Sequence, residues 1–338
     1  MAPVNRSVLR DDPLREARLA MQASNFREAW DALQRAPDEA RQTPEWLLLA
    51  AVTNFRLGHF ARCRSVALQA RDGFRARGDA DGEMRTDNAA AAGALALGDL
   101  TEARQGFERA LALSKHLRDG FMTARCANNL GIVAYYDAQY DRALSCYRLA
   151  AATFESLGSY DELAFNWLNS AQAWREWEWL DESRDASDRA VAAAERSADP
   201  RVLGQALATR AETLIALGDL ELARAQAERA LELARRYDDP LAEADALRIL
   251  SITARTSGNL PAALEVARQG LDIVQGIRHA WTQAEVQRDL GEVHVALGRR
   301  DEARAAFLAA AENFERLGSV SRAEAMRERA AALGGGSE

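Results

Sequence analysis

The sequence predicts an all-α fold, a solenoid of about eight helix-turn-helix repeats followed by one further C-terminal helix. Three observations predict it. The 338 residues contain only 7 prolines, and long stretches rich in alanine, leucine, arginine and glutamate favour helix. A short motif recurs at a fixed spacing along nearly the whole chain. Small residues recur at fixed places around that motif.

Each repeat is anchored on a turn residue, most often a glycine that follows a leucine. The run LGDLTEA at 97–103 recurs as LGDLELA at 217–223 and as LGRRDEA at 297–303. The spacing between successive anchors is shorter for the first pair and then identical for every later pair. The anchors are Ser24, Gly58, Gly98, Ala138, Glu178, Gly218, Gly258 and Gly298. A constant spacing of this length is typical of stacked structural repeats.

Three columns of small residues accompany the anchors. The positions seven before, five after and twelve after the eight anchors are all Ala, Gly, Ser or Cys, 24 positions in total. Where two helices cross closely, the contact point accommodates only a small side chain. Large apolar residues such as Phe26, Phe60 and Tyr140 stand two residues after the anchors. Large residues alternating with small ones predict an interdigitated core.

Each repeat is predicted to hold two helices joined at the anchor. The first runs from about 17 to 2 residues before the anchor, and the second from about 2 to 18 residues after it. The short first repeat ends at Pro37 and the next begins at Pro44. A polar helix at 320–333 is expected to cap the last apolar face. We therefore predict a disordered N-terminus at 1–11, a single superhelix over 12–333 and a disordered tail at 334–338.

Charge and hydropathy exclude several classes of partner. The net charge of −8 argues against a general nucleic-acid binder, which carries a basic face. The longest apolar run, 89–97, is far shorter than the roughly 20 residues that span a bilayer. The stretch 1–18 lacks the apolar segment of a signal peptide. We therefore expect a cytoplasmic location, with the cysteines as reduced thiols.

The repeat pattern resembles the tetratricopeptide repeat family, over about residues 12 to 333. Its 40-residue length, and the Asn-Leu-Gly run at 129–131, resemble the longer variant found in kinesin light chains, bacterial peptide receptors and the sensor arms of bacterial regulators. The resemblance implies a right-handed superhelix whose first helices line a concave groove. It also implies a groove that binds an extended peptide or a partner's helix, without catalysis.

The resemblance places a polar patch on the inner turns of the third to fifth repeats. Asparagine amides can pair with a peptide backbone, arginines with carboxylates, and tyrosines add contact area with a polar tip. The alternative is that these side chains bond one another between helices. The candidate partner-binding residues are Arg85, Asn88, Arg125, Asn128, Asn129, Tyr135, Tyr136, Asn169, Gln172 and Arg175. In the eighth repeat, a mixed charged set from Glu285 to Glu292 is either selective for basic ligand segments or an ordinary face with local ion pairs.

A tryptophan pair marks a possible second interaction patch. Trp177 and Trp179 flank Glu178, the one anchor that is charged. Exposed tryptophans are frequent interaction hot spots, whereas the alternative is that both rings fold back over the turn. Trp167 and Trp174 occupy positions that the family fills with core residues.

No catalytic, cofactor or metal motif is present in the sequence, and the four histidines lack metal-ligand spacing. The leading hypothesis is a non-enzymatic scaffold or adaptor that binds an extended peptide or helix of another protein in its groove. The alternative is a regulatory receptor whose superhelix changes shape on binding a peptide or small effector. A third possibility is a structural subunit that assembles through its convex face or its ends.

Overall fold

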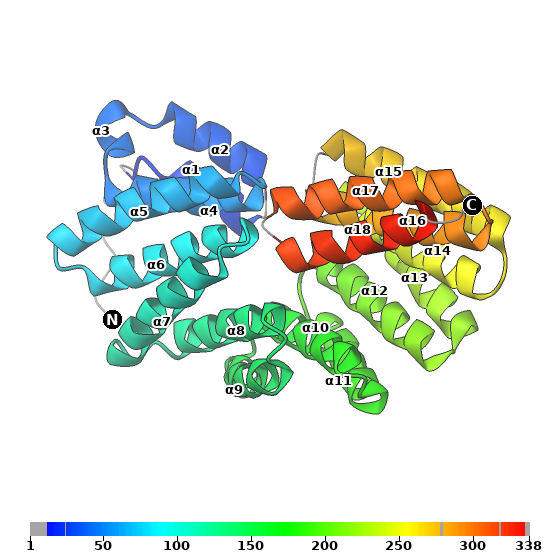
Figure 1. Ribbon diagram of the computed structural model, residues 1–338. Coiled ribbons are helices and arrows are strands. Elements are labelled where there is room, and N and C mark those ends of the chain that lie inside the picture. Colours follow the sequence, from blue (N-terminus) through cyan, green and yellow to red (C-terminus); the bar gives the residue numbers. More distant parts are fainter. Residues whose placement is uncertain (1–11, 24, 278–279, 318, 335–338) are drawn as a thin grey trace. The chain divides into compact units, whose positions relative to one another are not determined.

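The computed structural model describes residues 12–23, 25–277, 280–317 and 319–334, and all secondary structure in this part of the chain is helical (Figure 1). The helices are α1 (Arg15–Gln22), α2 (Phe26–Arg35), α3 (Asp38–Arg41), α4 (Pro44–Arg56), α5 (Phe60–Ala76), α6 (Ala80–Ala96), α7 (Leu100–His116), α8 (Gly120–Tyr136), α9 (Tyr140–Leu157), α10 (Tyr160–Glu176), α11 (Leu180–Ala194), α12 (Pro200–Leu217), α13 (Leu220–Arg236), α14 (Pro240–Thr256), α15 (Leu260–Ile277), α16 (Ala280–Ala296), α17 (Arg300–Arg316) and α18 (Val320–Gly334). The prediction of an all-α solenoid of helix pairs is confirmed.

The helices form two compact units, Met1–Val133 and Ala134–Glu338, and the boundary falls inside α8. The predicted N-terminal segment 1–11, residues 335–338 of the predicted tail 334–338, and the first anchor Ser24 lie outside the described residues. Gly334, expected in the tail, is the last residue of α18.

Backbone turns recur at half the repeat length. All seven described anchors, from Gly58 to Gly298, have a positive φ, which an L side chain rarely adopts. Four residues midway between anchors share this conformation: Gly78, Arg118, Gly158 and Asp238. A polar residue commonly follows the anchor and caps the next helix, as Asp99 does by accepting a hydrogen bond from the Glu102 backbone N–H at 3.0 Å. This turn-and-cap geometry reverses the chain after each helix.

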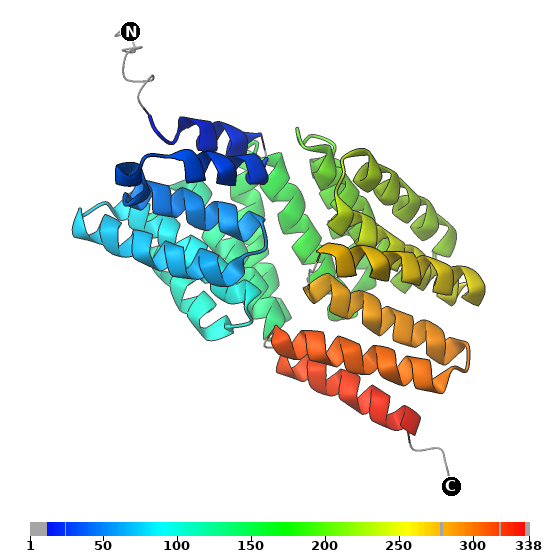
Figure 2. The same cartoon turned by 90° about the horizontal axis from the view of Figure 1, so that it is seen from above.

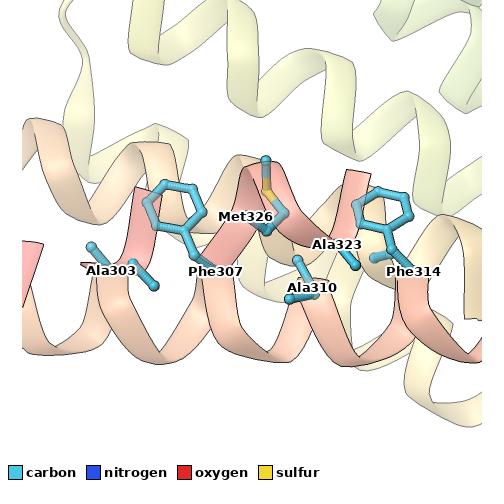
Figure 3. Packing of buried hydrophobic residues seen from close by; sticks show 9 residues of the cluster. Ala303, Phe307, Ala310, Phe314, Ala323 and Met326 are labelled. Atoms are coloured by element: carbon cyan, nitrogen blue, oxygen red, sulfur yellow. The ribbon is translucent and has the colours of Figure 1, made fainter. Parts of the chain in front are cut away.

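Small residues allow these helices to pack closely. The alanines five residues after the anchors, such as Ala103, Ala223 and Ala303, are fully buried. A Cβ added to Gly291 of α16 would lie 2.7 Å from the Phe307 ring of α17. Phe307 and Phe314 form a core with Met326 of α18 (Figure 3). The polar last helix therefore covers an apolar face of α17.

Alternate helices also touch one another. Within the second unit, α10 packs on α12, α12 on α14 and α14 on α16, in addition to contacts between sequence neighbours. Figure 2 shows the antiparallel neighbours α17 and α18 side by side at the C-terminal end of this stack. The first helices of successive repeats in this unit thus form a continuous inner face, and this face positions the candidate site.

Candidate functional site

The inner face of the second unit encloses a cavity of about 420 Å³. This volume lies within the range that is usual for ligand sites. The cavity is lined from α8, α10, α12, α14, α16 and α18. The lining residues are Tyr135, Gln172, Arg175, Glu176, Thr209, Glu212, Ile215, Asp245, Arg248, Ile252, Trp281, Thr282, Glu285, Arg288 and Arg322.

The repeat spacing explains why these side chains converge. The resemblance to the repeat family places the residues 13, 10, 9, 6, 3 and 2 before each anchor on an inner stripe of the first helix. Apart from Trp281, Thr282 and Arg322, each lining residue occupies one of these inner-stripe positions. A helix presents residues three and four apart on one face, so equivalent positions of stacked helices form a band across the inner surface. The cavity is therefore a product of the repeat register.

Arg248 lies at the centre of a charged network in this cavity. Its side chain is 8% exposed and pairs with Glu212 at 2.5 Å, Asp245 at 2.8 Å and Asp289 at 3.2 Å. These carboxylates come from α12, α14 and α16, so one guanidinium connects three consecutive inner helices. Buried charges are tolerated only when they are paired in this way.

The network extends in both directions along the inner face. Glu212 also pairs with Arg175 of α10 at 2.9 Å. On the other side, Arg288 pairs with Asp289 at 2.8 Å and with Glu285 at 2.6 Å. Arg322 of α18 reaches Glu285 at 3.1 Å. Alternating charges therefore connect α10 to α18.

The network changes the acidity of its carboxyl groups. Burial alone would raise the pKa of Glu212, but the positive charges of Arg175 and Arg248 outweigh it and lower this pKa to about 2. Burial raises the pKa of Asp245 above its ordinary value, against the opposing attraction of Arg248. Glu212 is thus held ionised by the two guanidinium groups that flank it.

Two buried polar atoms beside the cavity have no hydrogen-bond partner among the described residues. They are the hydroxyl of Tyr135, whose residue is 8% exposed, and Nη1 of Arg175. Leaving a buried donor unpaired costs about 1–3 kcal/mol. The wall of the cavity therefore contains hydrogen-bonding groups that the described residues leave unpaired.

An aromatic contact joins the first and late helices of the second unit. The Tyr136 ring lies 5.6 Å from the Tyr135 ring and 5.9 Å from the Trp281 ring, both edge to face. Tyr136 ends α8 and Trp281 begins α16, so this contact borders the cavity on the side of Tyr135. Tyr135, Gln172 and Arg175 are the predicted partner-binding residues that the structure brings together here.

The predicted residues of the first unit bind one another or their neighbours. Asn129 Nδ2 donates to Asn88 Oδ1 at 3.0 Å, which is the interhelical bonding given as the alternative. Arg85 pairs with Asp81 at 2.8 Å. The Arg125 guanidinium carbon lies 5.9 Å from the Phe121 ring centroid. Asn128 and, in the second unit, Asn169 are also engaged in contacts.

Sequence reasoning did not single out the central residues of the network. Glu212, Arg248 and Arg288 were expected on the inner stripe, but only the set from Glu285 to Glu292 was recognised as charged. In that set, the pairs of Arg288 with Glu285 and Asp289 are the local ion pairs expected as one alternative. The sequence did contain a sign of the network, because oppositely charged residues such as Glu212 and Arg248 occupy inner positions of consecutive repeats.

The tryptophan turn is exposed. Trp177 is 39% exposed and Trp179 is 50% exposed, and their rings stack at 5.5 Å. Trp174 lies 5.7 Å from each of them. The two rings thus lean on the third tryptophan of the turn and still present large surfaces to solvent.

Among the described residues, no group of three or more His, Cys, Asp or Glu side chains is arranged to hold a metal ion. Burial raises the pKa of the Cys63 and Cys126 thiols to about 12, which keeps both protonated near neutral pH. None of the helices in the described part of the chain has the length and apolar character needed to cross a membrane.

The comparisons with known proteins agree with this architecture. The tetratricopeptide repeat model matches residues 82–156 and 202–275. A Rap protein complexed with competence and sporulation factor aligns with a TM-score of 0.64 and 13% identity, over 95% of this chain and 96% of that chain. Aspartyl phosphate phosphatase F from Bacillus subtilis aligns with a TM-score of 0.56 and 14% identity, over 99% and 96%.

A STAND protein with a tetratricopeptide repeat sensor from Pyrococcus horikoshii aligns with a TM-score of 0.59 and 13% identity, over 95% of this chain and 51% of that chain. At these identities the likeness shows the fold alone. No sequence among the curated proteins matches this chain. The two matched segments carry tetratricopeptide repeats, and the helices outside them continue the same stacked helix pairs in the described part of the chain.

Proposed function

We propose that the chain is a protein-interaction scaffold that binds a peptide-like segment of a partner in the inner cavity of its second unit. The observation that carries the proposal is the pair of buried, unpartnered groups, Tyr135 Oη and Arg175 Nη1, beside a cavity lined by polar and charged side chains. A peptide supplies both donors and acceptors, which such a lining requires. The proposal moves the principal site from the third to fifth repeats to the fourth to eighth.

A conservative variant separates binding from folding. Tyr135→Phe removes only a hydroxyl that has no partner, so the free energy of unfolding should stay equal or rise. We would screen a library of short peptides by thermal stabilisation and measure the best peptide by calorimetry. The affinity for that peptide should fall about three- to tenfold in Tyr135→Phe, the value of one hydrogen bond.

Two further variants locate the site. Gln172→Ala, in the cavity, should also weaken binding, because its amide lines the same space. Arg125→Ala, in the first unit, serves as the control and should leave the affinity unchanged. If Arg125→Ala weakens binding while Tyr135→Phe and Gln172→Ala do not, the cavity is not the site.

A second candidate function is the regulatory receptor. The contact of Tyr136 with Trp281 favours it, because a ligand in the cavity lies beside a contact between helices far apart in sequence. The structurally similar Rap protein is itself complexed with a factor. Small-angle scattering with the best peptide distinguishes the two functions, since a receptor changes its dimensions on binding and a rigid scaffold does not.

A further inference from the structure

The turn at residues 176–179 departs from the sequence that is most frequent at the anchor turns, although its backbone has the same positive φ. Other anchor turns commonly place leucine before the anchor, glycine at it and a capping residue after it, as in Leu97-Gly98-Asp99 and Leu217-Gly218-Asp219. This turn has Trp177, Glu178 and Trp179 instead. The turn thus lacks all three features, as does the turn at Asp137-Ala138-Gln139, and it differs from that turn in carrying two tryptophans and a glutamate.

Each departure has a conformational cost. Glu178 adopts a φ of +63°, a conformation that suits glycine. Trp179 stands at the N-cap of α11, where no side chain accepts a hydrogen bond from the helix. Glu176 is the last residue of α10, the end of a helix at which a negative charge is unfavourable. Trp177 and Trp179 pack on each other and on Trp174, and Trp177 also contacts Tyr140, yet 39% and 50% of the two residues remain exposed.

The carboxylates of the turn have no cationic partner in the described structure. Residues 175–182 hold four acidic side chains and one arginine, Arg175, which is engaged by Glu212 inside the cavity. None of these four carboxylates makes an ion pair or hydrogen bond with another described residue. By contrast, the carboxylates of the charged network in the cavity are paired with arginines. The four are Glu176, Glu178, Asp181 and Glu182.

The tryptophan faces of the turn are also without a cation. Elsewhere among the described residues, an arginine stands over a tryptophan ring in three places: Arg62 over Trp30 at 4.8 Å, Arg189 over Trp167 at 4.9 Å and Arg322 over Trp281 at 4.9 Å. No described cation lies over Trp177 or Trp179, and the two rings stack at 5.5 Å. Indole faces attract cations, and guanidinium groups most often.

We propose that this acidic tryptophan turn, residues 176–182, is a docking surface for an arginine-bearing segment of a partner protein. The exposed indoles would receive guanidinium planes, and the unpaired carboxylates around them would bind the same cations. Of the residues in this turn, only Glu176 also lines the cavity. The turn would therefore give the partner a second contact site, and this proposal does not depend on binding in the cavity.

The test restores the repeat's own turn. A triple variant, Trp177→Leu, Glu178→Gly and Trp179→Asn, copies residues found at other anchors, such as Leu97, Gly98 and Asn259. The probe is a fluorescein-labelled hexa-arginine peptide, with a hexa-citrulline peptide of the same shape as the neutral control. Binding is measured by fluorescence anisotropy at low and at physiological salt.

The wild-type protein should bind the arginine peptide and not the citrulline peptide, more weakly as salt rises. The triple variant should bind the arginine peptide about five- to thirtyfold more weakly, from the loss of two cation–π contacts. It should also unfold at a higher temperature than the wild type, because glycine and a capping residue are restored. Glu221→Gln, a matched charge loss on the neighbouring repeat, should leave binding unchanged.

Three results would overturn the proposal. One is equal affinity of the wild type for the arginine and citrulline peptides. Another is a triple variant that binds the arginine peptide as well as the wild type, which would place the interaction elsewhere on this acidic protein. The third is a triple variant that unfolds at a lower temperature, which would show that the turn serves the fold.

Discussion

The left-handed turn residues permit a matched test of what the backbone contributes to the repeat. Ala138 and Gly218 are both anchors in the second unit, with φ values of +56° and +82°. A Cβ at Gly218 would have no atom within 4 Å, so its substitution changes only backbone energetics. We therefore predict opposite effects for Ala138→Gly and Gly218→Ala.

The magnitude follows from two opposing terms. A non-glycine residue in the left-handed region costs about 1–2 kcal/mol. Glycine in place of alanine makes the unfolded chain more flexible, at a cost of about 0.4–1 kcal/mol. Ala138→Gly should raise the free energy of unfolding by about 0.5–1 kcal/mol, and Gly218→Ala should lower it by a similar amount.

Urea denaturation followed by circular dichroism measures both variants, and because they lie in one unit they report on the same transition. Ala225→Gly, at an exposed position within α13, is the control and should lower the free energy of unfolding by about 1 kcal/mol. If Ala138→Gly is as destabilising as Ala225→Gly, the left-handed turn does not govern the stability of the repeat.

Further predictions concern the core, the network and the caps. Gly291→Ala should lower the free energy of unfolding by about 1–3 kcal/mol, because its Cβ would lie 2.7 Å from the buried Phe307 ring. Thermal unfolding compared with Gly276→Ala, another helical glycine whose added Cβ meets nothing within 4 Å, shows whether this clash dominates. The pKa of Glu212 is lowered to about 2, so its folded carboxylate stays ionised where the unfolded one takes up a proton. The stability deficit of Glu212→Gln should therefore be greatest above pH 5 and shrink as the pH falls towards 2, and a constant deficit in urea titrations would contradict the assignment. Asp99→Ala should cost about 1 kcal/mol in denaturant unfolding by removing the cap of α7, and Asp99→Asn, which can still cap, should retain most of the stability.

The fold was predictable because packing restricts every copy of the repeat in the same way. A crossing point that admits only a small side chain gives Ala103 in one repeat and Cys63 in another, and both are fully buried. Eight repetitions make such a weak local preference unmistakable. The ends of the helices could be predicted from the anchors, because one helix must end and the next begin where the chain reverses at each turn.

The site was only partly predictable, because it depends on pairing between helices. The register placed Glu212, Arg248 and Asp289 on the inner stripe or beside it, but which carboxylate meets which guanidinium depends on side-chain reach across two helices. The same limit applied to Asn88 and Asn129, which were expected to face a ligand and which bond each other. An inner position can be found from periodicity, whereas its partner requires the three-dimensional structure.

We expect the helices to stack without the charged network. Buried ion pairs can often be replaced by apolar residues without loss of stability, because desolvation offsets the attraction between the charges. The repeats themselves show this, since Ala208 occupies in the sixth repeat the position that Arg248 occupies in the seventh, and both are buried. A solenoid that stacks on alanine at this position does not need arginine there. If the cavity is the proposed binding site, ligand affinity should be more sensitive than stability to charge-neutral replacement of the whole network.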